Sequence, residues 1–221
     1  GGLMQLVAYG AQDVYLTGNP QITFFKVVYR RHTNFAIESI EQTFNGTVDF
    51  GRKVSCTVSR NGDLIHKVYL QVDLPALSGT NVGWVAQVGH ALIDEVSIEI
   101  GGQVIDKHYG DWLIIWNELT QTAEKESGYN EMIGNVTALT STADGSSPAS
   151  TLYIPLQFWF CRNPGLALPL IALQYHEVKF NLQFAALAAV TNGTITGSPS
   201  LGASLYVDYI YLDTDERRRF A

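Results

Sequence analysis

Residues 175–184 read YHEVKFNLQF, and this stretch decides the fold. Apolar and polar side chains alternate through it, because Val178, Phe180 and Leu182 are separated by Lys179 and Asn181. A period of two residues places successive side chains on opposite faces of a β-strand. The stretch is therefore predicted to be a strand with one face in an apolar core and the other toward polar surroundings.

Two neighbouring regions show the same alternation on both sides of a turn signal. The region 54–74 has Asn-Gly at 61–62, and the region 96–104 has Gly-Gly at 101–102. A two-residue hairpin turn needs positive φ at its central positions, which Asn and Gly adopt most readily. Both regions are therefore predicted to form β-hairpins.

Further alternating stretches occur at 22–29, 36–44, 152–160 and 204–213, which brings the total to eight or nine strands without βαβ spacing. This pattern is typical of an all-β fold. The predicted architecture is an eight-stranded antiparallel jelly-roll sandwich with a short helical insertion. The insertion is predicted at 111–127, capped by Asp111, from apolar residues at helical spacing, namely Trp112, Ile115, Trp116 and Leu119. Residues 78–89 and 140–151 are predicted to be loops, the second at an exposed tip.

Composition limits the function. The chain has 221 residues and a formal net charge of −7, which argues against a surface dedicated to nucleic acid. The one dense basic run is at 217–219, so no direct sequence-specific nucleic acid binding is predicted. Cys56 and Cys161 are isolated and have apolar neighbours, which predicts two small buried side chains rather than a disulfide framework.

The sequence offers little catalytic chemistry. The five histidines form no H-x-H or H-E-x-x-H arrangement, and the chain has no phosphate-binding glycine loop or nucleophile elbow. His66 and His176 are interpreted as hydrogen-bonded core or edge residues. No catalytic, cofactor-binding or metal-binding residue is predicted, no cofactor is expected, and the protein is predicted not to be an enzyme. Two alternatives remain open, a glycan-binding or spike module and a cupin-like metalloenzyme.

Some residues are candidates for modification or assembly. Three Asn-x-Thr triplets are candidate glycosylation acceptors, although Asn-Gly is also an ordinary turn dipeptide; they begin at Asn45, Asn135 and Asn192. The segment 164–173 is apolar and has prolines at 164 and 169, so burial against the domain or a partner is expected. The candidate assembly contacts are Leu166, Leu168, Leu170 and Ile171 in this segment, with Leu3, Leu6, Val7, Val14 and Leu16 near the N-terminus.

Five blocks of sequence resemble one family. Residues 2–26, 59–65, 100–109, 163–178 and 207–221 are similar to major capsid proteins of nucleocytoplasmic large DNA viruses, especially the algal-virus and giant-virus members. The blocks follow the family's order over essentially the whole chain.

The resemblance implies a subunit with two jelly rolls, three of which form a pseudo-hexagonal capsomer. Such capsomers build an icosahedral shell around an internal membrane. The partners implied are other copies in the trimer, neighbouring capsomers and minor capsid proteins, with the membrane met only indirectly. The implied location is the virion capsid, assembled in the host cytoplasm. The expected domains are an N-terminal arm at 1–20, a jelly roll at 21–216, and at 217–221 the start of a linker to a second jelly roll. A truncated chain is preferred over a one-domain relative.

Overall fold

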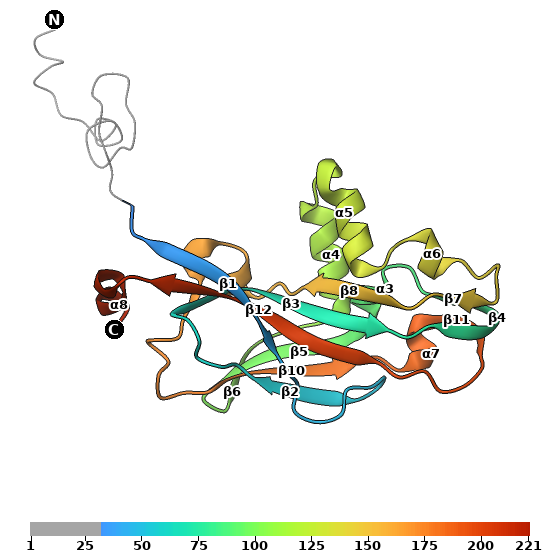
Figure 1. The fold of residues 1–221 in the computed structure, drawn as a ribbon, viewed down its shortest axis with the longest axis horizontal. Coiled ribbons are helices and arrows are strands. Elements are labelled where there is room, and N and C mark those ends of the chain that lie inside the picture. The colour runs from blue at the N-terminus through green and yellow to red at the C-terminus, as the bar shows by residue number, and fades with distance from the viewer. Residues whose placement is uncertain (1–31) are drawn as a thin grey trace, which may run out of the picture. The chain divides into compact units, whose positions relative to one another are not determined.

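Two antiparallel sheets face each other in the part of the chain that the computed structural model describes, residues 32–221 (Figure 1). One sheet has the strand order β1 (Phe35–Gln42), β12 (Gly202–Leu212), β3 (Leu64–Leu74) and β8 (Ser150–Pro155), and β9 (Leu168–Pro169) adds to β3. The other has the order β2 (Lys53–Thr57), β10 (Val178–Phe184), β5 (Ile93–Ile100) and β6 (Gln103–His108). This order is that of a jelly roll, so the predicted fold class is confirmed.

Differences in strand number come from short additional elements. A third sheet joins β11 (Thr191–Ile195), β4 (Leu77–Trp84) and β7 (Ser146–Ser147), so the described residues hold twelve strands rather than eight. The strand expected at 22–29 and the arm expected at 1–20 lie outside the described residues. Residues Phe35–Ala221 form one compact unit.

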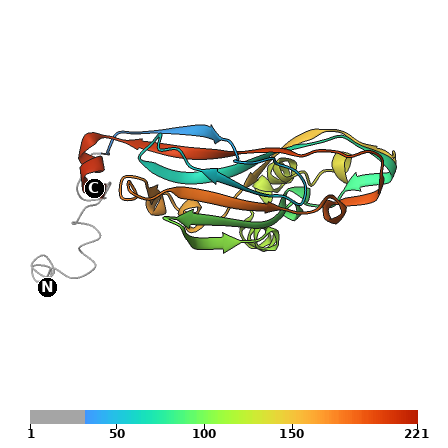
Figure 2. The same cartoon turned by 90° about the horizontal axis from the view of Figure 1, so that it is seen from below.

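The core lies between the two main sheets, whose layers are seen edge-on in Figure 2. The predicted inner face of β10 is buried, since Val178, Phe180, Leu182 and Phe184 are each at most 3% exposed. β10 pairs with β2 on one side and β5 on the other, so it is a central strand. The alternation of apolar and polar residues therefore identified the buried face of β10 correctly.

The predicted hairpin at 54–74 is wrong. β2 pairs with β10 and β3 pairs with β12, so the chain crosses from one sheet to the other between them. Neither Asn61 nor Gly62 has positive φ. Gly62 is needed for another reason, because a Cβ there would lie 2.7 Å from the Cβ of Tyr209. Tyr209 is fully buried, and its hydroxyl donates to the carbonyl of Ser59, so the crossing packs tightly against β12.

The second predicted hairpin is confirmed. β5 and β6 pair antiparallel, and Ile100 lies opposite Gln103 across a two-residue turn. Gly101 and Gly102 have φ of 60° and 85°, as a type I′ turn requires.

The helical insertion is longer than predicted and differently oriented. It consists of α4 (Gly110–Thr120) and α5 (Ala123–Ile133), which lie above β8 in the view of Figure 1. The N-cap of α4 is Tyr109, and Asp111 lies in the first turn without capping it. The buried residues of α4 are Gly110 and Leu113, so the predicted apolar face is not the buried face.

The two predicted loops also contain regular structure. β4 and α3 (Val88–Ala91) occupy most of 78–89, while α6 (Thr137–Thr140), β7 and the start of β8 occupy part of 140–151. The strand predicted at 152–160 ends at Pro155 and is followed by a 3₁₀ helix, η1 (Trp159–Cys161). The remaining helices are η2 (Pro164–Leu166), α7 (Leu187–Val190) and α8 (Thr214–Phe220).

Asp63 anchors the last described element. Its carboxylate accepts from the backbone N–H of Leu212 at 2.7 Å and forms a 3.1 Å ion pair with Arg217 of α8. The N-terminus of α8 is capped by Asp213, whose Oδ1 accepts from the N–H of Glu216. The expected boundary between residues 216 and 217 therefore falls inside a helix.

The crossing at Gly62 can be tested with a pair of glycine substitutions. Gly62→Ala is expected to lower the free energy of unfolding by about 1–3 kcal/mol, because the new methyl group must displace Tyr209. Gly128→Ala in α5 is the matched control, since a Cβ there meets nothing within 4 Å. It should raise stability by about 0.5–1 kcal/mol. Urea denaturation measures both, and an equal effect of the two substitutions would contradict the packing described.

Candidate assembly surfaces

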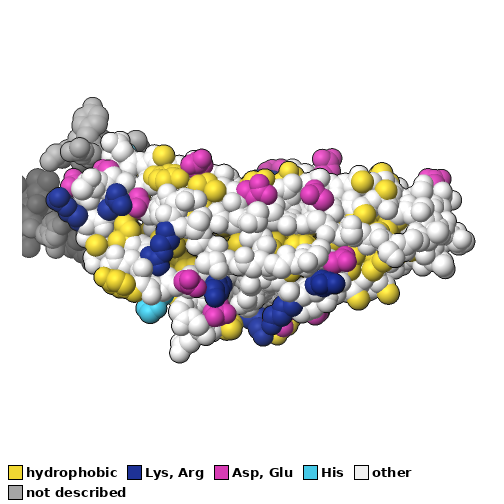
Figure 3. Space-filling model, turned by 60° about the horizontal axis from the view of Figure 1, so that its bottom comes forward, with side chains coloured by type: hydrophobic (Ala, Val, Ile, Leu, Met, Phe, Trp, Pro, Cys, Tyr) yellow, Lys and Arg dark blue, Asp and Glu magenta, His cyan; other side chains and the backbone are white. Residues whose placement is uncertain are grey.

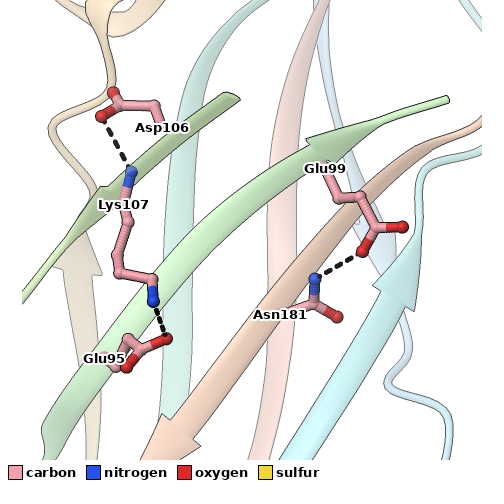
Figure 4. A network of polar contacts seen from close by, with 5 residues as sticks. All are labelled: Glu95, Glu99, Asp106, Lys107 and Asn181. Carbon is pink, nitrogen blue, oxygen red and sulfur yellow. Dashed lines mark hydrogen bonds and ion pairs between the residues drawn. The ribbon is translucent and has the colours of Figure 1, made fainter. Parts of the chain in front are cut away.

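The outer face of the second sheet is polar, and several of its polar side chains pair with one another. Lys107 forms a 2.9 Å ion pair with Glu95, and the amide of Asn181 donates to Glu99 at 3.1 Å (Figure 4). The hydrogen bond and charge of Glu95 raise the pKa of Lys107. On the side at the bottom of Figure 1, which Figure 3 brings toward the viewer, charges of both signs lie scattered among apolar and uncharged side chains. Charged groups that already have partners within the same face gain little free energy from an ion pair with another protein.

Exposed apolar side chains instead concentrate around β6 and α4. Of the eleven large hydrophobic residues that are exposed in the described chain, five lie between positions 104 and 119, with exposed fractions of 50–76%. We call this group the β6–α4 patch, and it consists of Val104, Ile105, Tyr109, Ile115 and Leu119. Exposed apolar patches of this kind mark interaction sites more often than isolated residues do.

An arginine lies on two indole rings next to this patch. The guanidinium of Arg162 is 4.5 Å from the ring centroid of Trp116 and 5.8 Å from that of Trp112. Arg162 forms no ion pair with another residue of the described chain. It lines two hollows, of about 300 and 380 Å³. The stacking holds the guanidinium in place by cation–π attraction while its charge stays available.

A second apolar region lies at the free edge of the first sheet. β1 pairs with β12 alone among the described strands, and Phe35 and Ile37 on it are 65% and 57% exposed. The strand also carries Glu38 and Glu41, both exposed, and neither forms an ion pair with a described residue. We call these four residues the β1 edge.

The β1 edge and the β6–α4 patch lie on opposite flanks. β1 and β6 are at the two ends of the strand orders of their sheets. Just after β1, Asn45 forms an isolated bridge with Ser55 of β2, the strand at the far side of the second sheet from β6. In Figure 2 the blue β1 belongs to the upper sheet layer and the green β5–β6 hairpin to the lower one.

The apolar segment at 164–173 is mostly part of the domain itself. Leu168 and Leu170 are only 7% and 4% exposed and belong to the core cluster of their own domain, so burial against the domain accounts for both side chains. Leu166 is exposed and Ile171 is half-buried, so these two remain accessible. The candidates Leu3, Leu6, Val7, Val14 and Leu16 lie outside the described residues.

The candidate glycosylation acceptors differ in accessibility. Asn45 and Asn192 are exposed. Asn135 is half-buried, and its amide accepts from the N–H of Gln87 and donates to Asn130. Glycosylation stays a prediction at all three positions, and the geometry favours the two exposed ones.

The histidines are structural groups in the described chain. His66 lies in the core with its Nδ1 2.9 Å from the carbonyl of Phe160, as predicted, whereas His176 lies in an exposed turn and not on a strand. His90 and His108 are buried, and burial lowers the pKa of each to about 4. Both ring nitrogens of His108 lack a partner, and its ring packs edge-on against Phe158.

No metal centre or reactive thiol emerges from the described residues. Within 32–221, no group of three His, Cys, Asp or Glu side chains is arranged to hold a metal ion. Cys56 and Cys161 are buried as predicted, and burial raises the pKa of their thiols to about 11 and 12. Among these residues no helix is long and apolar enough to cross a membrane.

Sequence reasoning missed the residues that define the flanks. Arg162 follows Cys161 without any motif, and nothing in the sequence places it on Trp112 and Trp116. The adjacent apolar residues Val104 and Ile105 were a usable signal, because strict alternation would leave one of them on the solvent face.

Comparison with known proteins gives the family. The family described as "Major capsid protein N-terminus" matches residues 23–213. The chain belongs to this major capsid protein family. It is 66% identical to the major capsid protein of Pyramimonas orientalis virus and 51% identical to that of Paramecium bursaria Chlorella virus 1. Both matches cover 100% of this chain but only 55% and 50% of the relative. The chain thus spans about half the length of these curated relatives.

Solved structures of capsid proteins share the fold. The crystal structure of PBCV-1 VP54 superimposes with a TM-score of 0.78 at 44% identity, covering 90% of this chain and 48% of VP54. The Faustovirus major capsid protein superimposes with a TM-score of 0.76 at 12% identity, covering 96% of this chain and 60% of that one. The second likeness shows that the jelly roll is kept where little sequence is shared.

The buried histidines predict a loss of stability in acid. Their folded pKa of about 4 lies below the ordinary value of 6.5, so between these values only the unfolded chain takes up the protons. The free energy of unfolding should be independent of these groups above pH 6.5. It should fall by up to about 1.4 kcal/mol per pH unit for each histidine as the pH drops toward 4.

Chemical denaturation at a series of pH values measures this dependence. His108→Phe should remove the contribution of one proton from the pH dependence of the free energy of unfolding, because the new ring can pack against Phe158 without titrating. His176→Gln is the control substitution, since it replaces a histidine whose side chain is exposed. A slope that His108→Phe does not alter would refute the assignment.

Proposed function

We propose that this chain is the first jelly roll of a major capsid protein that self-assembles into pseudo-hexagonal trimeric capsomers of an icosahedral shell. One observation carries the proposal: a jelly roll similar to PBCV-1 VP54 presents apolar surfaces on both flanks. A structure titled as the PBCV-1 virus capsid also matches, with a TM-score of 0.76 at 44% identity. A sandwich that stands in a shell buries its flanks against neighbours and leaves its loops at the two ends.

The role is structural rather than enzymatic. The relatives are named as capsid proteins, and the buried histidines and thiols of this chain have structural explanations. The partners would be other copies in the trimer, neighbouring capsomers and minor capsid proteins, with the inner membrane met only indirectly. The protein would reside in the virion capsid after assembly in the host cytoplasm.

Direct nucleic acid binding has no support in the basic run at 217–219. Arg217 is paired with Asp63, and Arg219 is paired with Glu216 at 3.2 Å. With these two charges neutralised and a net charge of −7, the chain offers little to a phosphate backbone.

The glycan-binding alternative draws on one feature, the cluster of Tyr109, Trp112 and Trp116 near Asp106. Sugars bind such clusters by stacking on exposed ring faces. Here the guanidinium of Arg162 already lies over one face of each indole ring, which leaves less ring surface for a sugar. The shell function is therefore favoured.

Self-association tests the proposal. The protein, expressed from its complete reading frame, should sediment as a trimer and form ring-shaped particles or hexagonal arrays in negative-stain electron microscopy. Glycan arrays provide the comparison. A monomer at every concentration, with or without glycan binding, would contradict the shell function.

The N-terminal arm can be tested separately. Its apolar residues show no sustained period, so we expect it to order against neighbours rather than support the domain. Deletion of residues 2–20 should leave the melting temperature nearly unchanged and impair capsomer or array formation. Circular dichroism and sedimentation measure the two effects, and normal assembly of the deleted protein would refute this role.

A further inference from the structure

We propose that the hollow between β3, the end of β8 and α4 binds a doubly charged oxyanion, a phosphate or sulfate group, through Arg162 and Lys67. This inference goes beyond the shell function, because it concerns a ligand site within one subunit. It rests on the walls of the hollow, the charges that line it, the way Arg162 is held and the uncharged donors beside it.

Segments that are distant in the sequence enclose the hollow, which has a volume of about 300 Å³. Lys67 and Tyr69 come from β3, Trp116 comes from α4, and Gln157 and Arg162 lie just before and just after η1. All of these walls belong to one chain. The hollow is therefore complete within a single subunit and needs no partner to form it.

The charged side chains that line the hollow are all cations. Lys67 and Arg162 form no ion pair with another described residue, and within the described chain no aspartate or glutamate lines the hollow. Both cations lie near one point, the thiol of Cys161: burial raises its pKa to about 12, and both positive charges act in the opposite direction. Two neighbouring cations repel each other, and a ligand with two negative charges removes this repulsion.

Arg162 is held in position without a ligand. Its guanidinium lies 4.5 Å from the ring centroid of Trp116 and 5.8 Å from that of Trp112, and it donates to the carbonyl of Gln157 at 3.4 Å. The planar fork of a guanidinium matches the oxygens of a phosphate group. Because the stacking already restricts the side chain, little conformational entropy is lost when an anion binds.

Two uncharged donors complete the site. The hydroxyl of Tyr69 and the side-chain amide of Gln157 line the hollow and form no hydrogen bond with another described residue. Burial raises the pKa of Tyr69, and the charge of Asp208 raises it further, so the hydroxyl keeps its proton at neutral pH. Both groups can therefore donate to the oxygens of an anion.

The adjoining hollow does not share this character. Arg162 also lines that space of about 380 Å³, together with Asp106 and Lys107. Lys107 is already paired with Glu95 at 2.9 Å, and the carboxylate of Asp106 would repel an anion. The anion is therefore assigned to the hollow that contains Lys67.

Equilibrium dialysis against radiolabelled inorganic phosphate tests the site in the complete protein. The wild type should bind a single phosphate per subunit, and unlabelled sulfate should displace it. Acetate carries one charge and should need a concentration about 10-fold higher or more for the same displacement. Melting temperatures verify that each variant is folded.

Substitutions in the hollow should change phosphate affinity in both directions. R162M and K67M should each weaken binding about 10-fold or more, because each removes a charged hydrogen-bond donor. R162K should weaken it less, since it keeps the charge but loses the stacked fork. D208N should strengthen binding about 2-fold to 5-fold, because it removes the negative charge near Tyr69.

K53M is the matched control for K67M. Lys53 is an exposed lysine on β2, in the other sheet, and it forms no ion pair with a described residue. K53M removes the same charge away from the hollow and should bind phosphate as the wild type does.

A competition experiment identifies the source of the oxyanion. A short peptide with a phosphoserine and its unphosphorylated counterpart would compete with the labelled phosphate. Displacement by the phosphopeptide at a lower concentration than by inorganic phosphate would support a site for a phosphoryl group carried by a protein. Displacement only at a higher concentration would support a site for the free anion.

Three results would overturn the proposal and leave the shell function standing. The first is a folded wild type that binds no phosphate. The second is phosphate binding that R162M and K67M both leave unchanged. The third is displacement by acetate as readily as by sulfate, because the site would then not select a doubly charged ligand.

Discussion

The apolar core layer between the two main sheets constrains the rest of the molecule. β10 shows this most clearly, because Phe180 and Leu182 fill the layer while Lys179 and Asn181 occupy the opposite face. Each inward side chain loses its contact with water only while both sheets stay in register. The polar face is thereby fixed outward, where Asn181 pairs with Glu99. The flanks, where the sheets end, are left as the places where apolar residues remain uncovered.

Much of this layer could be predicted from the sequence. Strict alternation located β10, β12 and the β5–β6 hairpin, because period two has a direct geometric meaning and Gly101-Gly102 has the φ that its turn demands. The blocks similar to capsid proteins correctly gave the family. Local signals succeeded wherever the local structure alone decided the pairing.

Prediction failed where distant residues decide. Asn61-Gly62 has the signature of a hairpin turn, yet the chain crosses between the sheets there and Gly62 packs against Tyr209, almost 150 positions away. The apolar spacing in α4 marked one face of the helix, although the buried residues of the helix are Gly110 and Leu113. Leu168 and Leu170 were listed as candidate contacts, although both belong to the core cluster of their own domain. In each case a local pattern was read correctly, and the distant residues that decide the packing were not visible in it.

The central claim is that the opposite flanks of this jelly roll are built to contact other copies. A cryo-electron microscopy reconstruction of the assembled protein tests it most directly. The account predicts that α4 and β1 are both covered by neighbouring density. A reconstruction in which both flanks face solvent and neighbouring jelly rolls meet through the polar face around Asn181 would contradict it.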